Sequence, residues 1–192
     1  MPRSCLRFAF LVSSLVCLVV ASARAHAQTT PETSVTASPA NMDNVVSAFG
    51  LFSYWYADAG LGIGVRFQKT LVPGGVLKLP TLHEEIGIEG GLDYFHYGFD
   101  NVGYNWTYNE YALLVGGVWN FWFLGDKLAV YPKIEIGYRF GSWSTNTGVT
   151  SPGGYGGLVV QGSAGVVYKI SRVTLRAEAG SGSLRLGAGF AL

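Results

Sequence analysis

Few residues in this sequence could carry out catalysis. The chain has three histidines. His26 lies within residues 1–27, which are predicted below to be a removed signal peptide, so His83 and His96 are the candidates for a general base. Catalysis needs a nucleophile, a base and an orienting group within reach of one another. Glu84 and Glu85 beside His83 are metal-ligand types, but three such residues in a proline-rich turn are more often solvated. We therefore predict no catalytic site, no cofactor and no metal.

Charged residues are scarce but regularly spaced. They make up 13% of the sequence, and 13 Lys and Arg against 12 Asp and Glu leave no basic excess for binding nucleic acid. Buried charges are costly unless they are paired. We therefore expect a structural charge network inside the fold, with Glu135–Arg139 and Arg176–Glu178 as local pairs, and not the ring of like charges that an ion-selective pore needs. The predicted members, six positive and five negative, are Arg66, Glu89, Asp93, Glu110, Lys133, Glu135, Arg139, Lys169, Arg176, Glu178 and Arg185.

The elements that position these charges are segments in which apolar residues alternate with small or polar ones. Successive side chains of a strand point to opposite faces, so a period of two predicts strands. Within 128–141, for example, Ile134, Ile136 and Tyr138 alternate with Lys133, Glu135 and Gly137. The predicted strands are 46–56, 60–69, 84–98, 105–123, 128–141, 156–170, 172–180 and 184–192.

The segment 46–56 has the poorest alternation of the eight. Phe52, Tyr54 and Tyr56 fall on the presumed interior face there. The alternative is one long strand over 53–68, which leaves seven strands. Bacterial single-chain barrels usually have an even number of strands, so we predict a separate first strand.

The composition decides which face is buried. The sequence is 49% hydrophobic and contains 27 glycines among 192 residues. The solvent face of a soluble sandwich normally carries many Lys, Glu, Ser and Thr. A transmembrane barrel inverts this arrangement, with apolar side chains toward lipid and small and polar ones in a narrow lumen. The predicted fold is all-β, an antiparallel up-and-down transmembrane β-barrel of eight strands.

The N-terminal residues 1–27 have the layout of a secretory signal peptide. Arg3 and Arg7 precede an apolar stretch over 11–20, and small residues end the segment at Ala27. Both cysteines, Cys5 and Cys17, lie in it, so the mature chain would hold no disulfide. Residues 28–45, rich in Thr, Ser and Pro, are predicted to be a flexible periplasmic lead-in, and 46–192 the barrel.

Loops and aromatic residues predict which end of the barrel is which. Short connections at 124–127 and 171–172 suit the periplasmic side, whereas the connection at 70–83 is long for a periplasmic turn. The predicted outer loops are 99–104 and 142–155. Aromatic side chains gather at membrane–water boundaries. We expect such a position for Trp119, Phe121, Trp122 and Phe123 beside the turn at 124–127, and for Trp143 and Tyr155 beside the longest outer loop.

With its signal peptide, alternating strands and amphipathic terminal strand Leu184–Leu192, the sequence resembles the small bacterial outer-membrane β-barrels of the OmpA/OmpX-like kind. The resemblance implies location in the outer membrane, lipid as a partner, and recognition of the terminal strand by the barrel-assembly machinery. Members of that family end in an aromatic residue, whereas here the aromatic Phe190 is two places early. Barrels of similar size that deacylate lipid A carry a His-x-Ser element, but Tyr97 and Gly98 follow His96.

The predicted function is therefore a non-enzymatic outer-membrane barrel with a structural or surface-contact role carried by the loops at 99–104 and 142–155. Three alternatives stay open. One is porin-like transport of small solutes or apolar molecules. The second is a lipid A-modifying enzyme with His96 as its base, and the third is a soluble periplasmic barrel that binds an apolar ligand.

Overall fold

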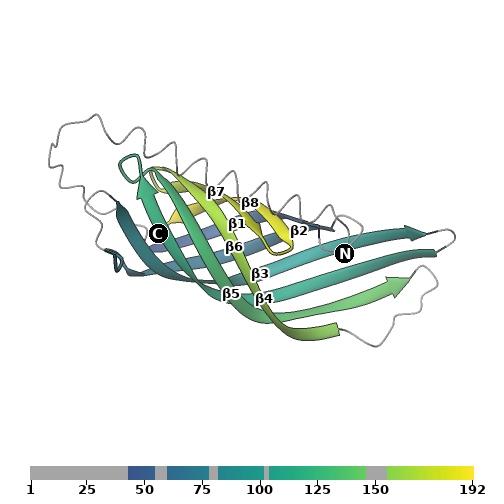
Figure 1. Ribbon diagram of the computed structural model, residues 1–192. Helices are drawn as coiled ribbons and strands as arrows, with labels where there is room; N and C mark the ends of the chain where they lie inside the picture. Colours follow the sequence, from purple (N-terminus) through teal and green to yellow (C-terminus); the bar gives the residue numbers. More distant parts are fainter. Residues whose placement is uncertain (1–42, 55–59, 78–81, 102–103, 146–154) are drawn as a thin grey trace, which may run out of the picture. The chain divides into compact units, whose positions relative to one another are not determined.

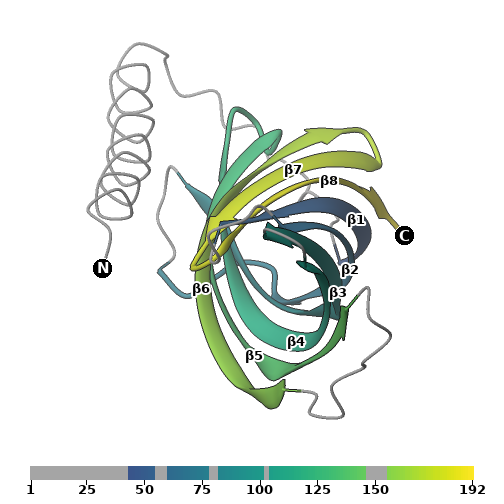
Figure 2. The ribbon, with the colours of Figure 1, turned by 90° about the vertical axis from the view of Figure 1, so that its right-hand side faces the viewer.

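The protein forms a closed antiparallel β-barrel of eight strands in which each strand pairs with its neighbours in sequence and β1 pairs with β8 (Figures 1 and 2). The structure is a computed structural model, and it describes residues 43–54, 60–77, 82–101, 104–145 and 155–192. The strands are β1 (Asn44–Ser53), β2 (Gly60–Val72), β3 (His83–Asn101), β4 (Tyr104–Phe123), β5 (Leu128–Thr145), β6 (Tyr155–Ile170), β7 (Val173–Gly180) and β8 (Ser183–Ala191). The described residues include no helix long and apolar enough to cross a membrane.

The prediction of eight strands with a separate first strand is confirmed. β1 begins at Asn44, two residues before the predicted boundary, and ends at Ser53. The strands reach into both predicted outer loops. β3 and β4 pair as far as Asn101 with Tyr104, within the predicted loop 99–104, and β5 continues to Thr145, within the predicted loop 142–155. The predicted signal peptide, the lead-in up to residue 42, Tyr56 and the loop residues 146–154 lie outside the described residues.

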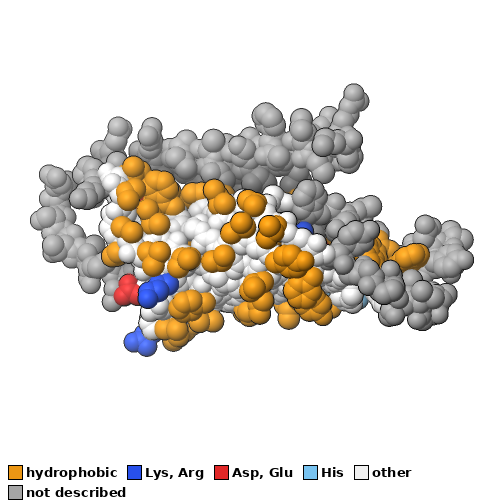
Figure 3. Space-filling model, turned by 90° about the horizontal axis from the view of Figure 1, so that it is seen from below, with side chains coloured by type: hydrophobic (Ala, Val, Ile, Leu, Met, Phe, Trp, Pro, Cys, Tyr) orange, Lys and Arg blue, Asp and Glu red, His pale blue; other side chains and the backbone are white. Residues whose placement is uncertain are grey.

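Apolar side chains cover the outside of the barrel wall, as the alternation predicts. Leu61, Ile63, Ile134, Leu158 and Leu186 are each at least 65% exposed. Figure 3 shows hydrophobic side chains spread over the wall of the barrel on the face in view. The inward positions on the same strands hold small, charged and aromatic side chains, which the wall shields from solvent.

The predicted phase of β1 is wrong. Phe52 and Tyr54 point outward and are 40% exposed, whereas Phe49 and Leu51 point inward and are buried. The pairing explains this, since Phe49 lies opposite Gly64 of β2 and Gly187 of β8. A Cβ at Gly187 would lie 2.6 Å from the Phe49 ring, so this glycine leaves the room that the ring occupies.

The interior is divided along the strands into two apolar clusters with charges between them. Near the ends of the strands joined by the turns 124–127 and 171–172, called the turn end here, Trp122, Tyr131 and Val45 pack together. Near the opposite end, called the loop end, Phe49, Phe95, Tyr97 and Tyr108 pack together. The charged residues occupy the inward positions between these two clusters.

Four strands extend the barrel at the loop end. β2 pairs with β3 only as far as Leu61 with His96, and β7 pairs with β6 only as far as Gly180 with Ser163. Beyond these points β3, β4, β5 and β6 continue as an open sheet, which Figure 1 shows projecting past the shorter strands. Within the described strands, the final residues of β3 and the first residues of β6 pair on one side only, so they form the edges of this sheet.

Candidate functional site

The centre of the barrel holds Lys133 among three carboxylates. Its ammonium lies 2.7 Å from Glu89, 2.8 Å from Glu178 and 3.4 Å from Glu135. The four residues come from β3, β5 and β7, and their side chains are at most 2% exposed. The closed sheet brings them together because all of them occupy inward positions.

Three arginines complete the network around these carboxylates. Arg185 pairs with Glu135 at 3.0 Å and with Asp93 and Glu178 at 3.1 Å. Arg66 pairs with Asp93 at 2.6 Å, Glu135 at 3.4 Å and Glu89 at 3.7 Å. Arg176 pairs with Glu89 at 2.7 Å and with Glu178 at 3.1 Å.

The connected network is electrically neutral. It joins the cations Arg66, Lys133, Arg176 and Arg185 to the anions Glu89, Asp93, Glu135 and Glu178. Each of these four carboxylates contacts two or three of these cations, which offsets the cost of removing the charges from water. Neutral side chains add further hydrogen bonds, because the Tyr131 hydroxyl donates to Glu178 at 2.7 Å and the Gln161 amide to Glu135 at 2.9 Å.

Three of the predicted network residues lie apart from this group. Glu110 and Arg139 form a separate ion pair of 3.1 Å nearer the loop end. Lys169 faces inward near the turn end, half-buried, and forms no ion pair with any described residue. Of the predicted local pairs, Arg176–Glu178 is present at 3.1 Å, whereas Glu135 and Arg139 pair elsewhere. Positions four apart on a strand are separated by about 13 Å, too far for a direct contact.

Two carboxylates that the sequence suggested were solvated are buried. The Glu85 carboxylate accepts a 2.8 Å hydrogen bond from the Trp122 indole, and Glu84 accepts one of 2.8 Å from Trp119. Glu84 also accepts a hydrogen bond from the Leu77 backbone N–H, so the β2–β3 connection covers it. The prediction of a boundary position for Trp122 is wrong, because this side chain points into the barrel and is 2% exposed.

The two candidate histidines both belong to β3 but lie in separate surroundings. The His83 ring contacts the Asp126 carboxylate at 3.1 Å and the Pro73 carbonyl at 3.0 Å, tying together two connections at the turn end. His96 is exposed on the outer face, where its Nδ1 contacts the Asn109 side chain at 2.9 Å. Among the described side chains there is no group of three or more His, Cys, Asp or Glu placed to hold a metal ion.

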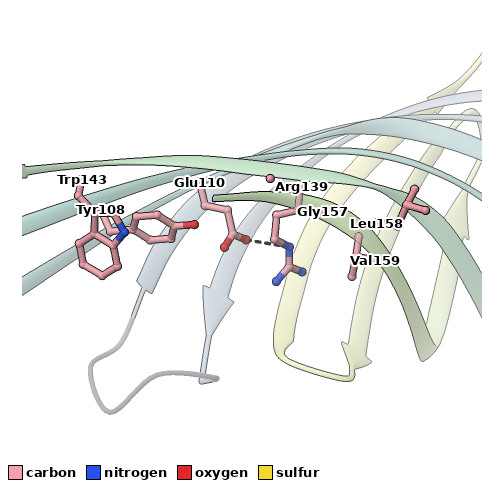
Figure 4. Close-up of a pocket in the computed structure, with 8 residues that line it drawn as sticks. Tyr108, Glu110, Arg139, Trp143, Gly157, Leu158 and Val159 are labelled. Atoms are coloured by element: carbon pink, nitrogen blue, oxygen red, sulfur yellow. Dashed lines mark ion pairs between the residues drawn. The ribbon is translucent and has the colours of Figure 1, made fainter. Parts of the chain in front are cut away.

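A pocket of about 550 Å³ opens at the loop end, lined by residues of β4, β5 and β6 in the projecting sheet (Figure 4). Tyr108 and Trp143 form one wall, with ring centroids 4.5 Å apart. Glu110 and Arg139 line the pocket beside these rings, and β6 contributes Gly156, Gly157, Leu158 and Val159. Trp143 was expected at the membrane boundary, but it points inward and is half-buried against Tyr108.

The polar groups of this pocket are incompletely used. Glu110 is 1% exposed, and its Oε2 atom has no hydrogen-bond partner among the described residues. Arg139 approaches Glu110 through Nε at 3.1 Å, and in Figure 4 its two terminal nitrogens point away from this ion pair. The pocket therefore offers an acceptor and donors beside an aromatic wall, a combination that the alternation pattern alone does not reveal.

No protein-family model and no curated protein matches this chain. Solved structures do match its fold. The attachment invasion locus protein Ail of Yersinia pestis, in complex with the heparin analogue sucrose octasulfate, aligns with a TM-score of 0.52 and 14% identity over 77% of this chain and 97% of that chain. Neisserial surface protein A aligns at 0.49 and 12% identity over 78% and 96%. The chain has the fold of the small bacterial outer-membrane β-barrels of the OmpA/OmpX-like kind, as predicted from the sequence.

Proposed function

We propose that this protein is an integral outer-membrane barrel without enzymatic activity, closed inside and active through surface contact at its loop end. The observation that carries the proposal is that apolar side chains cover the outside of the barrel while charged side chains fill its inside. Leu158 is 82% exposed on the outside, whereas the Lys133 and Glu89 side chains inside are 0% exposed. An exterior of this kind is stable only where lipid covers it. The predicted signal peptide at 1–27 supports export, and 28–43 would then precede the barrel in the periplasm.

The packing of the interior favours a closed barrel and not a transport channel. Below the pocket at the loop end, a space beside Asp93, Ala112 and Arg185 holds only about 10 Å³. That is about the least that one water molecule needs. The neutral ion-pair network fills the centre, so the porin-like alternative predicts conductance steps in planar bilayers, whereas our proposal predicts a silent bilayer.

The projecting sheet supports contact with partners outside the cell. Its free edges and its half-buried aromatic residues lie at the end where the chain connects through 102–103 and 146–154. A polyanionic ligand such as the heparin analogue in the Ail structure does not suit this chain. Residues 46–65, 91–126 and 140–168 contain no Lys or Arg, so Arg139 is the basic residue nearest to the projecting sheet.

Site-directed labelling tests both the location and the orientation. No cysteine follows Cys17, so a single cysteine can be introduced as a reporter. A membrane-impermeant maleimide should label Ser142→Cys at the loop end in intact cells. It should label the matched Lys127→Cys in the turn 124–127 only after the outer membrane is permeabilised. The opposite pattern, or a mature chain that stays soluble without detergent, would overturn the proposal and favour the soluble periplasmic barrel.

The hypothesis of a lipid A-modifying enzyme is tested by replacing His96, its candidate base. Our proposal predicts that His96→Ala leaves the lipid A of the cell unchanged, and a changed lipid A profile would restore the enzyme hypothesis.

We also propose that the barrel-assembly machinery reads β8. Phe190 points outward and is 47% exposed, which leaves its ring available before insertion. Phe190→Ala should lower the amount of folded barrel in the outer membrane, measured by heat-dependent gel migration, while Leu192→Ala serves as its control at the same end.

A further inference from the structure

We propose that the pocket at the loop end, lined by Tyr108, Trp143, Glu110, Arg139, Gly157 and Val159, binds a ring of an uncharged sugar. Its volume of about 550 Å³ falls within the range typical of small-molecule sites, about 300–1,000 Å³. Three features of its lining point to this ligand chemistry: a wall of aromatic rings, an unused buried acceptor, and donors whose charge is already balanced.

The aromatic wall supplies the first part of the recognition. Tyr108 and Trp143 lie 4.5 Å apart, and Phe99 packs on Trp143 at 5.8 Å, so the rings support one another. The face of an aromatic ring carries partial negative charge. It therefore attracts the weakly positive C–H groups on the flat side of a sugar ring.

The ion pair supplies the second part. Oε2 of the buried Glu110 has no hydrogen-bond partner within the described ranges, so a sugar hydroxyl that reached it would supply the missing hydrogen bond. The Arg139 side chain is 26% exposed, and its Nε atom, although 3.1 Å from Glu110 Oε1, makes no hydrogen bond within the described part of the chain. A group that both donates and accepts, such as a hydroxyl, satisfies both residues at once.

The charge of the site argues for a neutral ligand. Glu110 already neutralises Arg139 at 3.1 Å, and the sequence places no other Lys or Arg in the flanking segments 91–126 and 140–168. A carboxylate, phosphate or sulfate ligand would therefore face Glu110 without a spare cation. A purely apolar ligand would leave the buried carboxylate oxygen unpaired, which is costly.

Two glycines of β6 provide a test substitution and its matched control. At Gly157, which lines the pocket, an added Cβ would meet nothing within 4 Å, so Gly157→Val fills pocket space without a clash at the backbone. An added Cβ at Gly162, on the same strand but outside the pocket, also meets nothing within 4 Å. Gly162→Val is therefore the matched control.

The experiment uses the full chain purified in a polyoxyethylene detergent, which contains no sugar. Maltose and lactose are the neutral probes, and glucuronate and glucose 6-phosphate are the anionic ones. Binding is followed by saturation-transfer NMR and by tryptophan fluorescence. We expect saturable binding of a neutral sugar that weakens about tenfold, equivalent to the loss of one good contact, in Gly157→Val and in Trp143→Ala. Gly162→Val should bind as the unmodified chain does, and heat-dependent gel migration shows that each variant is a folded barrel.

Three results would overturn the inference: no saturable binding of either neutral sugar, binding unchanged in Gly157→Val, or tighter binding of the anionic probes. The biological meaning of the pocket rests on the proposed function, which places the loop end outside the cell. The two fail separately, because the cysteine labelling tests the orientation in cells and the sugar titration tests the pocket in detergent. Vesicles containing lipopolysaccharide with or without its outer sugars then distinguish a sugar of the same membrane from one supplied from outside.

Discussion

Lys133 is the residue on which the central charges converge. Its ammonium contacts three carboxylates from β3, β5 and β7, and those carboxylates in turn contact Arg66, Arg176 and Arg185. Removing one member of a buried ion pair leaves its partner charged and uncompensated. The stability of the barrel therefore depends on the charge of this ammonium more than on its volume.

Lys133→Met should lower the free energy of unfolding by about 3–5 kcal/mol, the usual cost of breaking a buried pair from one side. The measurement is urea unfolding of the refolded barrel, followed by tryptophan fluorescence. Lys169→Met is the matched control, because Lys169 forms no ion pair with described residues and should change stability little. Equal losses in the two variants would show that the network does not stabilise the fold.

At this scale the sequence predicts which way a side chain points better than what it touches. The alternation placed all eleven charges on inward positions, because the period of two depends only on the local backbone. Contacts depend on the register between strands, which one sequence does not specify. Arg66 and Asp93 are 27 positions apart, and neither their ion pair nor the Trp122–Glu85 hydrogen bond has a local signal.

The strands pack closely because glycine lies opposite large interior rings. At Gly165 of β6 a Cβ would lie 2.5 Å from the Tyr131 ring and 2.8 Å from the Ala177 carbonyl. Tyr131 in turn donates a hydrogen bond to Glu178, so the ring cannot move away without breaking the network. The glycine content thus reflects the packing of individual strand pairs.

Gly165→Val should destabilise the barrel by about 1–3 kcal/mol, because overpacking displaces the Tyr131 ring. Gly162→Val on the same strand meets no atom within 4 Å and should be close to neutral. Thermal unfolding, read as the temperature of the gel-migration shift, compares the two. A drop of the same size in both would assign the effect to β6 itself and not to the ring.

The turn between β6 and β7 offers a stabilising change. Ser171 has a φ of 59°, a conformation that side chains other than glycine rarely adopt, whereas Arg172 has no such strain. Ser171→Gly should raise the free energy of unfolding by about 1 kcal/mol, since the left-handed conformation costs other residues roughly 1–2 kcal/mol. Arg172→Gly should bring no gain, and urea unfolding of the two variants checks the difference.

The strands could be predicted from the sequence where the alternation was strong. The prediction of the inward face failed where both faces of a strand are apolar. β5 and β6 were placed to within a few residues, but β1 was assigned the opposite phase. Phe49 and Leu51 belong to the interior cluster while Phe52 and Tyr54 are exposed, so hydrophobicity alone does not distinguish the two faces. The pairing with Gly64 and Gly187 decides the phase, and it is a property of the closed barrel.

The molecule as a whole carries its apolar side chains on the outside and its charges inside. One substitution on the outer face tests whether that face contacts lipid. Leu113 lies on the outer face of β4 and is 57% exposed. In a soluble protein Leu113→Arg would change stability by about 0.5 kcal/mol or less. In a bilayer the same change should cost about 2–4 kcal/mol near the midplane. Reversible unfolding from phospholipid vesicles gives the value, and a near-neutral result there would contradict a lipid-facing wall.

The unequal strands described above impose a hydrophobic mismatch on one side of the barrel. β7 has 8 residues and β4 has 20. At about 3.3 Å per residue and a tilt of about 40°, β7 spans roughly 20 Å along the membrane normal, less than the usual apolar band of about 25 Å. Lipid beside β7 and β8 must therefore thin, or the barrel must lean toward that side. Thinning leaves the barrel upright, whereas a lean tips the projecting sheet away from the membrane normal and turns its edges obliquely to the membrane plane.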